Sequence, residues 1–228
     1  MEGKLFSELS LMKNNHTSFS SGIDFTLVDP RATTRDVEKS IDVAYTNRYY
    51  GVVFNPSFTM HARKLIDAKY SSALKLTSLI GYPLGCSHTK TKIQETIQAV
   101  KDGADEIEVV VNIGKVKEGD FNYIKQEFLK IRRKAKKKLL KGVLETAYLT
   151  EQEIQKLVNA LARAKVDMIV TSTGYAPLGA DIEIVENLVK VAKREKMLVK
   201  AAGGISSKSQ AENFMRLGTM RIGTSRVL

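Results

Sequence analysis

Two hydrophobic patterns alternate along most of this chain. Short runs rich in apolar and β-branched residues are separated by longer segments in which apolar residues recur every three or four positions. The first pattern predicts buried strands and the second predicts amphipathic helices. Eight strands are expected, at Ile23–Leu27, Tyr50–Phe54, Leu74–Ile80, Glu106–Val111, Lys141–Thr146, Asp167–Thr171, Leu198–Ala201 and Arg221–Thr224.

Strict alternation of eight strands with helices predicts an α/β fold, a single-domain (β/α)8 TIM barrel over residues 1–228. No Gly-x-Gly-x-x-Gly sequence follows the first strand, which disfavours a dinucleotide-binding fold. Residues 1–21 are expected to be an N-terminal extension, with a short extra helix at Leu5–Met12 covering the bottom of the barrel. Only four residues follow the last strand, so the eighth helix is expected to be truncated or missing.

Composition fits an ordinary globular protein, with 43% hydrophobic and 27% charged residues. A single cysteine, Cys86, excludes an intrachain disulfide and fits a reducing cytoplasm. No apolar run is long enough for a signal peptide or a bilayer span. The sequence therefore predicts a soluble, cytoplasmic protein without a membrane partner.

The net charge of +11 first raises the question of nucleic-acid binding. The densest basic run, at residues 130–138, is expected at the end of a helix, where cations complement the negative end of the helix dipole. No nucleic-acid motif accompanies it. A basic surface also attracts a small phosphorylated sugar, which is the partner that we expect.

Charged residues occur inside the predicted strands, where burial is costly unless the charges are paired. Because side chains alternate along a strand, Glu106 and Glu108 share one face, and Lys141 and Glu145 share another. Two lysines and one or two glutamates are therefore expected to converge inside the barrel. Lys200 is expected to be buried, whereas Glu106 is expected to lie in water at the start of its strand.

The loops after the seventh and eighth strands are rich in glycines and hydroxyls. They read Ala202-Gly203-Gly204-Ile205-Ser206 and Gly223-Thr224-Ser225-Arg226. Glycines let backbone N–H groups approach an anion, and hydroxyls add donors, so these loops are candidates for phosphate binding. Ordinary turn chemistry is the alternative interpretation.

Motifs in the same order along nearly the whole chain resemble those of the deoxyribose-phosphate aldolases. The Gly81-Tyr82-Pro83-Leu84-Gly85 segment is similar to the family's Gly-Phe-Pro-Leu-Gly, and Ile169–Gly174 resembles its Lys-Thr-Ser-Thr-Gly strand end. The other matching segments are Ile23–Leu27, Gly51–Pro56, Thr89–Lys92, Gly103–Glu108, Leu140–Thr146, Val199–Ile205 and Arg221–Ser225.

The resemblance implies a class I aldol reaction. A lysine forms an imine with the aldehyde, and 2-deoxyribose 5-phosphate is cleaved reversibly to acetaldehyde and glyceraldehyde 3-phosphate. No cofactor and no metal are implied.

The resemblance also assigns roles to individual residues. Lys200 corresponds to a lysine that lowers the pKa of the nucleophile through like-charge repulsion. Lys141 corresponds to a lysine that moves protons together with an aspartate, whose position holds Glu108. Asp24 and Thr26 match the opening polar pair. The implied substrate and phosphate contacts are Thr173, Gly203, Gly204, Gly223, Thr224 and Ser225.

Three positions depart from the family pattern. Val53 stands where many members have cysteine, and Glu108 is one methylene longer than the expected aspartate. Val170 stands at the position of the nucleophilic lysine, and valine cannot form an imine.

Three interpretations follow from these departures. The nucleophile has moved to Lys200, or to the more distant Lys141. Alternatively, the protein is a non-catalytic pseudoenzyme or altered variant that binds only a sugar phosphate. The least favoured interpretation is a basic nucleic-acid module on a barrel scaffold. A homo-oligomer is compatible with each of them.

Overall fold

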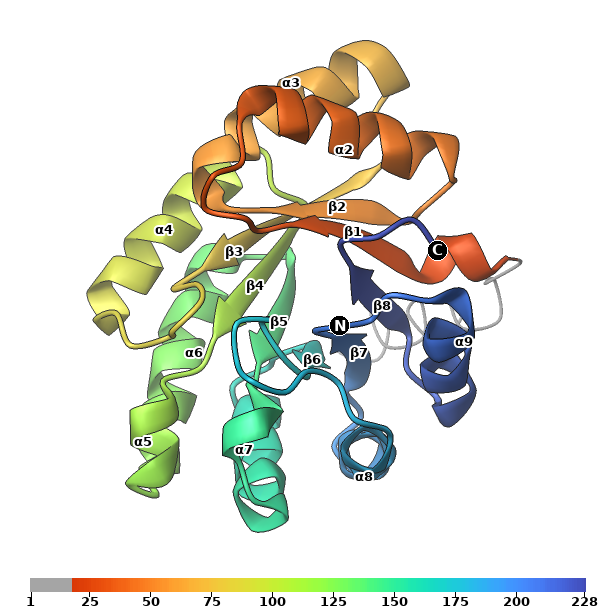
Figure 1. Cartoon of the computed structure of the whole chain (residues 1–228). Coiled ribbons are helices and arrows are strands. Elements are labelled where there is room, and N and C mark those ends of the chain that lie inside the picture. Colours follow the sequence, from red (N-terminus) through yellow and green to blue (C-terminus); the bar gives the residue numbers. More distant parts are fainter. Residues whose placement is uncertain (1–17) are drawn as a thin grey trace.

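A computed structural model describes residues 18–228, in which eight parallel strands close into a barrel (Figure 1). Each strand pairs with its neighbour in sequence, and β1 closes the barrel by pairing with β8. The strands are β1 (Ile23–Leu27), β2 (Gly51–Phe54), β3 (Lys75–Ile80), β4 (Glu106–Val110), β5 (Leu139–Val143), β6 (Met168–Val170), β7 (Leu198–Ala202) and β8 (Arg221–Thr224). The predicted TIM barrel is confirmed.

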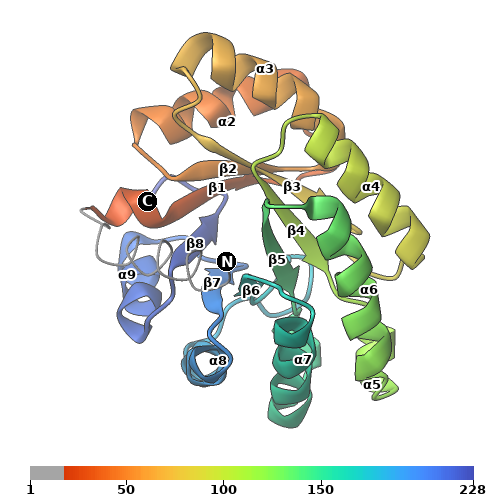
Figure 2. The same cartoon turned by 180° about the vertical axis from the view of Figure 1, so that it is seen from behind.

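Helices surround the strands on the outside of the barrel, as Figures 1 and 2 show from opposite sides. They are α2 (Thr34–Thr46), α3 (Thr59–Tyr70), α4 (Thr89–Lys101), α5 (Ile113–Lys117), α6 (Phe121–Ala135), α7 (Glu151–Arg163), α8 (Ile182–Arg194) and α9 (Lys208–Leu217). Short 3-10 helices form at η1 (Phe19–Gly22), η2 (Pro56–Phe58) and η3 (Thr146–Tyr148). No described helix is long and apolar enough to cross a membrane.

The helices agree with the prediction after β8 but not between β4 and β5. No helix follows β8 within residues 18–228, as expected from the short stretch beyond that strand. The connection between β4 and β5 instead contains an additional short helix, α5. The extra helix predicted at Leu5–Met12 lies outside the described residues.

Helix starts follow local sequence chemistry. A capping box joins Thr33 and Asp36 at the start of α2, and another joins Thr150 and Glu153 at the start of α7. The basic run lies at the end of α6, which stops at Ala135. These caps fix where the helices begin against the barrel.

Two apolar cores lie between the strands and the surrounding helices. In one, outward-facing Ile107 and Leu140 belong to the same buried cluster as Phe128 of α6. In the other, Val52 and Ile222 cluster with Phe214 of α9. Because side chains alternate along each strand, the neighbouring positions point into the barrel, and these carry the charged residues.

The fifth strand ends earlier than predicted. It stops at Val143, whereas the sequence pattern extended it to Thr146. Glu145 adopts a left-handed conformation, with φ of 55° and ψ of 63°, and this conformation cannot continue a strand. Glu145 is therefore not a strand residue, and its carboxylate contacts the loop after β6.

Candidate active site

Six charged side chains meet inside the barrel, and each of these residues is at most 5% exposed. We call them the charged cluster: Asp24, Glu106, Glu108, Lys141, Lys200 and Arg221. The strand register brings them together, because Glu108 pairs with Lys141 and Lys200 pairs with Arg221 in adjacent strands. The predicted convergence of two lysines with glutamates is therefore present.

Lys141 lies between three carboxylates. Its Nζ is 2.7 Å from Glu106, 3.3 Å from Asp24 and 3.5 Å from Glu108. It also donates a hydrogen bond of 3.2 Å to the hydroxyl of Thr77. Burial alone would lower the pKa of Lys141, but the surrounding carboxylates raise the pKa above its usual value. Lys141 is thus held as a cation.

Lys200 bridges the other side of the cluster. Its Nζ lies 2.9 Å from Glu108 Oε2 and 3.0 Å from Asp24 Oδ2. Burial favours the neutral form of Asp24, but Lys141, Lys200 and Arg221 hold the pKa of that carboxyl well below its usual range. Lys200 therefore faces two acceptors, of which Asp24 is held ionised.

Glu106 corrects the sequence prediction. It was expected in water, yet it is 3% exposed and accepts hydrogen bonds from the hydroxyls of Tyr50 (3.0 Å) and Thr77 (3.1 Å). Arg221, which the prediction missed, lies 3.0 Å from Asp24 and 3.7 Å from Glu106. Its guanidinium stacks on the ring of Tyr50. The sequence could have indicated its position, because side chains alternate along a strand and Arg221 therefore shares the inward face of β8 with Gly223.

The charges of the cluster balance, because three cations face three carboxylates. An unpaired charge in a barrel interior would be strongly unfavourable, so this balance explains how three basic and three acidic side chains can share the space. Among residues 18–228, no group of histidine, cysteine and acidic side chains is arranged to hold a metal ion.

An apolar layer lies next to the charged cluster, towards the C-terminal ends of the strands. We call Val110, Val143 and Val170 the valine layer; all three are fully buried. Val170 pairs with Val143 on one side and with Lys200 on the other. Tyr82 and Ala202 pack against the layer. Val170, which the sequence resemblance aligned with a nucleophilic lysine, is thus a buried apolar contact beside Lys200.

The two candidate phosphate loops leave the barrel side by side, since Ala202 pairs with Gly223. Gly204 is exposed, has a φ of 74°, and has open space where a Cβ would be. Ser225 is also exposed. Thr224 instead is buried, and its hydroxyl donates to the carbonyl of Ile205, which joins the two loops.

The remaining predicted residues have other surroundings. Thr26 is half-buried, and its hydroxyl donates to the backbone carbonyl of Asp24 at 3.2 Å. Gly223 faces Lys200 so closely that an added Cβ would lie 2.9 Å from Lys200 Cε. Thr173 is 8% exposed, and its backbone N–H and hydroxyl both donate to Glu145. Burial raises the pKa of Glu145.

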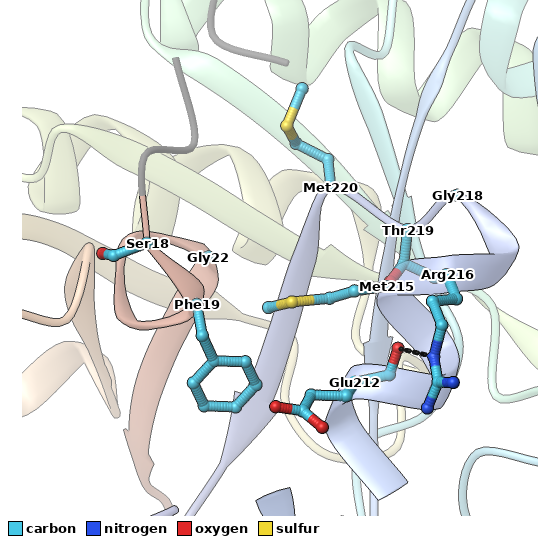
Figure 3. A pocket seen from close by; sticks show the side chains of 9 residues that line it. All are labelled: Ser18, Phe19, Gly22, Glu212, Met215, Arg216, Gly218, Thr219 and Met220. Atoms are coloured by element: carbon cyan, nitrogen blue, oxygen red, sulfur yellow. Dashed lines mark hydrogen bonds between the residues drawn. The ribbon is translucent and has the colours of Figure 1, made fainter. Parts of the chain in front are cut away.

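A separate cavity of about 480 Å³ lies at the opposite end of the barrel, between η1 and α9. Figure 3 shows Phe19 and Met215 facing one another across this space, with Met220 beside it. The cavity adjoins the start of β8, whereas the candidate phosphate loops leave from the ends of β7 and β8. The cavity is therefore distinct from the site of the charged cluster.

Known proteins share this architecture and sequence. A sequence model described as DeoC/LacD family aldolase matches residues 12–218. A deoxyribose-phosphate aldolase of Finegoldia magna is 39% identical over 203 residues, covering 89% of this chain and 93% of that protein. One from Clostridium botulinum is 38% identical over 206 residues, covering 90% and 95%.

Solved structures agree with these relatives. The deoxyribose phosphate aldolase of Aeropyrum pernix, described as tetrameric, has a TM-score of 0.85 and 32% identity, with 91% of this chain and 86% of that chain covered. Fold and sequence together define an aldolase-type TIM barrel. The chain belongs to the DeoC/LacD family of aldolases.

Proposed function

We infer that this protein binds 2-deoxyribose 5-phosphate or a closely similar phosphorylated sugar. Cleavage to acetaldehyde and glyceraldehyde 3-phosphate through an imine at position 170 is lost. The protein then acts as a sugar-phosphate-binding member of a carbon–carbon lyase family. This proposal includes a cytoplasmic role in carbohydrate catabolism, and a homo-oligomer like the tetrameric Aeropyrum pernix relative.

The observation that carries this proposal is the environment of Val170. The side chain is completely buried against Val110 and Val143 and offers no amine to a carbonyl. The neighbouring amine, on Lys200, is held between Asp24 and Glu108. An imine forms only where a carbonyl reaches a free amine, and the Nζ of Lys200 is instead engaged by both of these carboxylates.

Phosphate binding is supported by the loops after β7 and β8. Gly204 and Ser225 are exposed beside the barrel mouth, and Gly204 leaves room for an anion to approach the backbone. The basic net charge favours the approach of an anionic ligand. Binding therefore does not depend on the lost nucleophile.

A second candidate function is weak aldolase activity with Lys200 as the nucleophile. The observation in its favour is the register, which places Lys200 directly beside Val170 in the neighbouring strand. A substrate that separated Lys200 from Glu108 would free the amine. Lys141 is a weaker candidate because three carboxylates surround it.

Calorimetric titration with 2-deoxyribose 5-phosphate and with 2-deoxyribose tests the binding proposal. We expect binding of the phosphorylated sugar alone. The Gly204→Asp variant should weaken binding roughly tenfold or more, because a carboxylate beside a phosphate is repulsive. Gly204→Asn is the matched control, since it carries the same backbone strain without the charge. Equal affinity for both sugars would exclude phosphate recognition.

Borohydride treatment in the presence of 2-deoxyribose 5-phosphate separates the two candidates. Reduction of an imine adds a stable mass to the protein, which mass spectrometry detects. We expect no added mass on the natural sequence. An added mass that disappears in the Lys200→Met variant would instead establish the weak aldolase.

A further inference from the structure

Two tyrosines from different loops meet across the C-terminal mouth of the barrel. Tyr82, in the loop after β3, donates a hydrogen bond of 2.5 Å to the carbonyl of Thr173 in the loop after β6. Tyr175, in that second loop, donates one of 2.8 Å to the carbonyl of Val28 after β1. The two rings touch edge to face, with centroids 5.8 Å apart. We call this pair the tyrosine bar.

The bar is anchored at Thr173. The backbone N–H and hydroxyl of Thr173 both contact the buried carboxyl of Glu145. The Thr173 hydroxyl accepts a hydrogen bond from the backbone N–H of Tyr175 at 3.1 Å. One residue thus fixes both tyrosines to the end of the barrel.

The bar covers the valine layer through Tyr82. Tyr82 packs against this cluster of Val110, Val143 and Val170, and all three valines are fully buried. The charged cluster follows immediately along the same strands. On the β7 and β8 side the surroundings differ, because Gly204 and Ser225 are exposed and Ala202 is only half-buried.

We propose that Tyr82 and Tyr175 determine which ligands reach the charged cluster. The bar admits an unbranched carbon chain that enters from the β7 and β8 side while its phosphate stays at Gly204 and Ser225. A branched or bulky chain end is excluded unless the bar opens. The identity of the phosphorylated ligand rests on the proposed function, whereas the restriction of access does not.

The hydroxyl of Tyr82 holds the bar closed through its hydrogen bond to the Thr173 carbonyl. The corresponding position in the family motif is phenylalanine, which packs on the valine layer but cannot bond to the Thr173 carbonyl. Tyr175 is 49% exposed, and among the described residues its side chain is held by one hydroxyl bond, to Val28, and by the ring contact with Tyr82. A closure held by so few contacts opens readily, and removal of either hydroxyl shifts it towards the open state.

A thiol placed beneath the bar measures access without any ligand. Val170→Cys puts a reactive group of similar size in the valine layer, and Cys86→Ser removes the exposed native thiol. In this background the second-order rate of alkylation by iodoacetamide reports how often the bar opens. Circular dichroism verifies that each variant retains the fold.

We expect Tyr82→Phe or Tyr175→Phe to accelerate alkylation roughly fivefold to tenfold, as for the loss of one hydrogen bond. Tyr148→Phe is the matched control, because Tyr148 is an exposed tyrosine of η3 with no hydroxyl bond to the described residues. Rates that are unchanged in both bar variants would overturn the proposal. A thiol that stays unreactive in the Tyr82→Phe, Tyr175→Phe double variant would overturn it as well.

Reagent size tests the selection of unbranched chains. N-ethylmaleimide should react faster than N-cyclohexylmaleimide in the parent, and the ratio of the two rates should fall in the double variant. An unchanged ratio would refute size selection. Neither reagent carries a phosphate, so failure of sugar-phosphate binding and failure of the bar give separate results.

Discussion

The charged cluster and the valine layer occupy adjacent levels of one barrel interior, and they differ in what their burial requires. The charged cluster holds six acidic and basic side chains whose positions depend on one another, since Lys141 alone contacts three carboxylates. The valine layer holds three side chains that need only apolar contact. The family resemblance would place the nucleophilic amine in that second level, at the position of Val170.

The difference shows that the charged cluster is self-sufficient in its ion pairs. Three cations and three carboxylates satisfy one another, so the cluster is maintained by its own pairing rather than by catalysis. Val170 contacts none of these carboxylates through an ion pair, so the pairing within the cluster does not depend on the residue at position 170.

The largest expected effect comes from placing an amine in the valine layer. In Val170→Lys, burial and the neighbouring cations lower the pKa of the new amine, because no carboxylate remains to pair with it. A neutral amine at pH 7 is a nucleophile. We expect the borohydride adduct to form and cleavage to rise on the order of 10³-fold, measured as acetaldehyde release.

Val170→Met is the matched control for that substitution, since it adds similar bulk without an amine. It should leave cleavage at the level of the natural sequence. Adding Glu108→Asp to Val170→Lys should increase cleavage further, because it restores the expected carboxylate position. A folded, sugar-binding Val170→Lys protein that forms no imine would show that the site no longer supports aldol chemistry.

The two levels should also differ in stability after mutation. Arg221→Met leaves Asp24 and Glu106 without one of their cations, and breaking a buried ion pair costs about 3–5 kcal/mol of unfolding free energy. Val143→Ala removes only apolar contact and should cost about 2 kcal/mol. Urea unfolding measures both.

The surface pair of Arg31 with Asp29 provides the control, because both side chains are largely in water. Arg31→Met should leave the unfolding midpoint unchanged. If Arg221→Met were no more destabilising than Val143→Ala, the charged cluster would not depend on its internal pairing.

A smaller loss of unfolding free energy is expected at acidic pH. The pKa values of Asp24 and Glu106 are lower in the folded protein than their ordinary values of 3.8 and 4.5. Their contribution to stability is therefore complete above those values and is lost as the pH falls towards the folded-state values. The unfolding free energy should fall between about pH 5 and about pH 3.

Glu145 changes the unfolding free energy with pH in the opposite direction. Burial raises its pKa, so its contribution is present below its ordinary value of 4.5 and is lost as the pH rises through the folded value. Glu145→Gln removes that opposing contribution and should make the acid-induced fall steeper. Urea unfolding at several pH values checks this, and a shallower fall would contradict the assignment.

The fold followed from the sequence because strands and helices have different local periods. Seven predicted strands agree with the structure to within a residue or two, and the fifth differs because the left-handed backbone at Glu145 leaves no trace in the apolar pattern. Alternation alone also placed Glu108, Lys141 and Lys200 inside the barrel. These properties depend on residues that are close along the chain.

Features that depend on distant partners were harder to predict. Glu106 shares a face with Glu108 in the sequence pattern, but its burial depends on Tyr50 and Arg221, which come from other strands. In the tyrosine bar, the hydroxyl of Tyr82 donates to the carbonyl of Thr173 across the barrel mouth. Neither contact has a local period, so only the closed barrel reveals it.

The bare backbone at Gly223 makes room for the side chain of Lys200. A methyl group there would crowd the aliphatic chain of Lys200, with an approach of 2.9 Å to Cε. A lineage that keeps lysine at position 200 is therefore expected to keep glycine at position 223. Shortening the lysine alone does not free position 223, because an added Cβ would also lie 2.9 Å from the Cβ of Ala202, so the strand pair β7–β8 itself requires a glycine there.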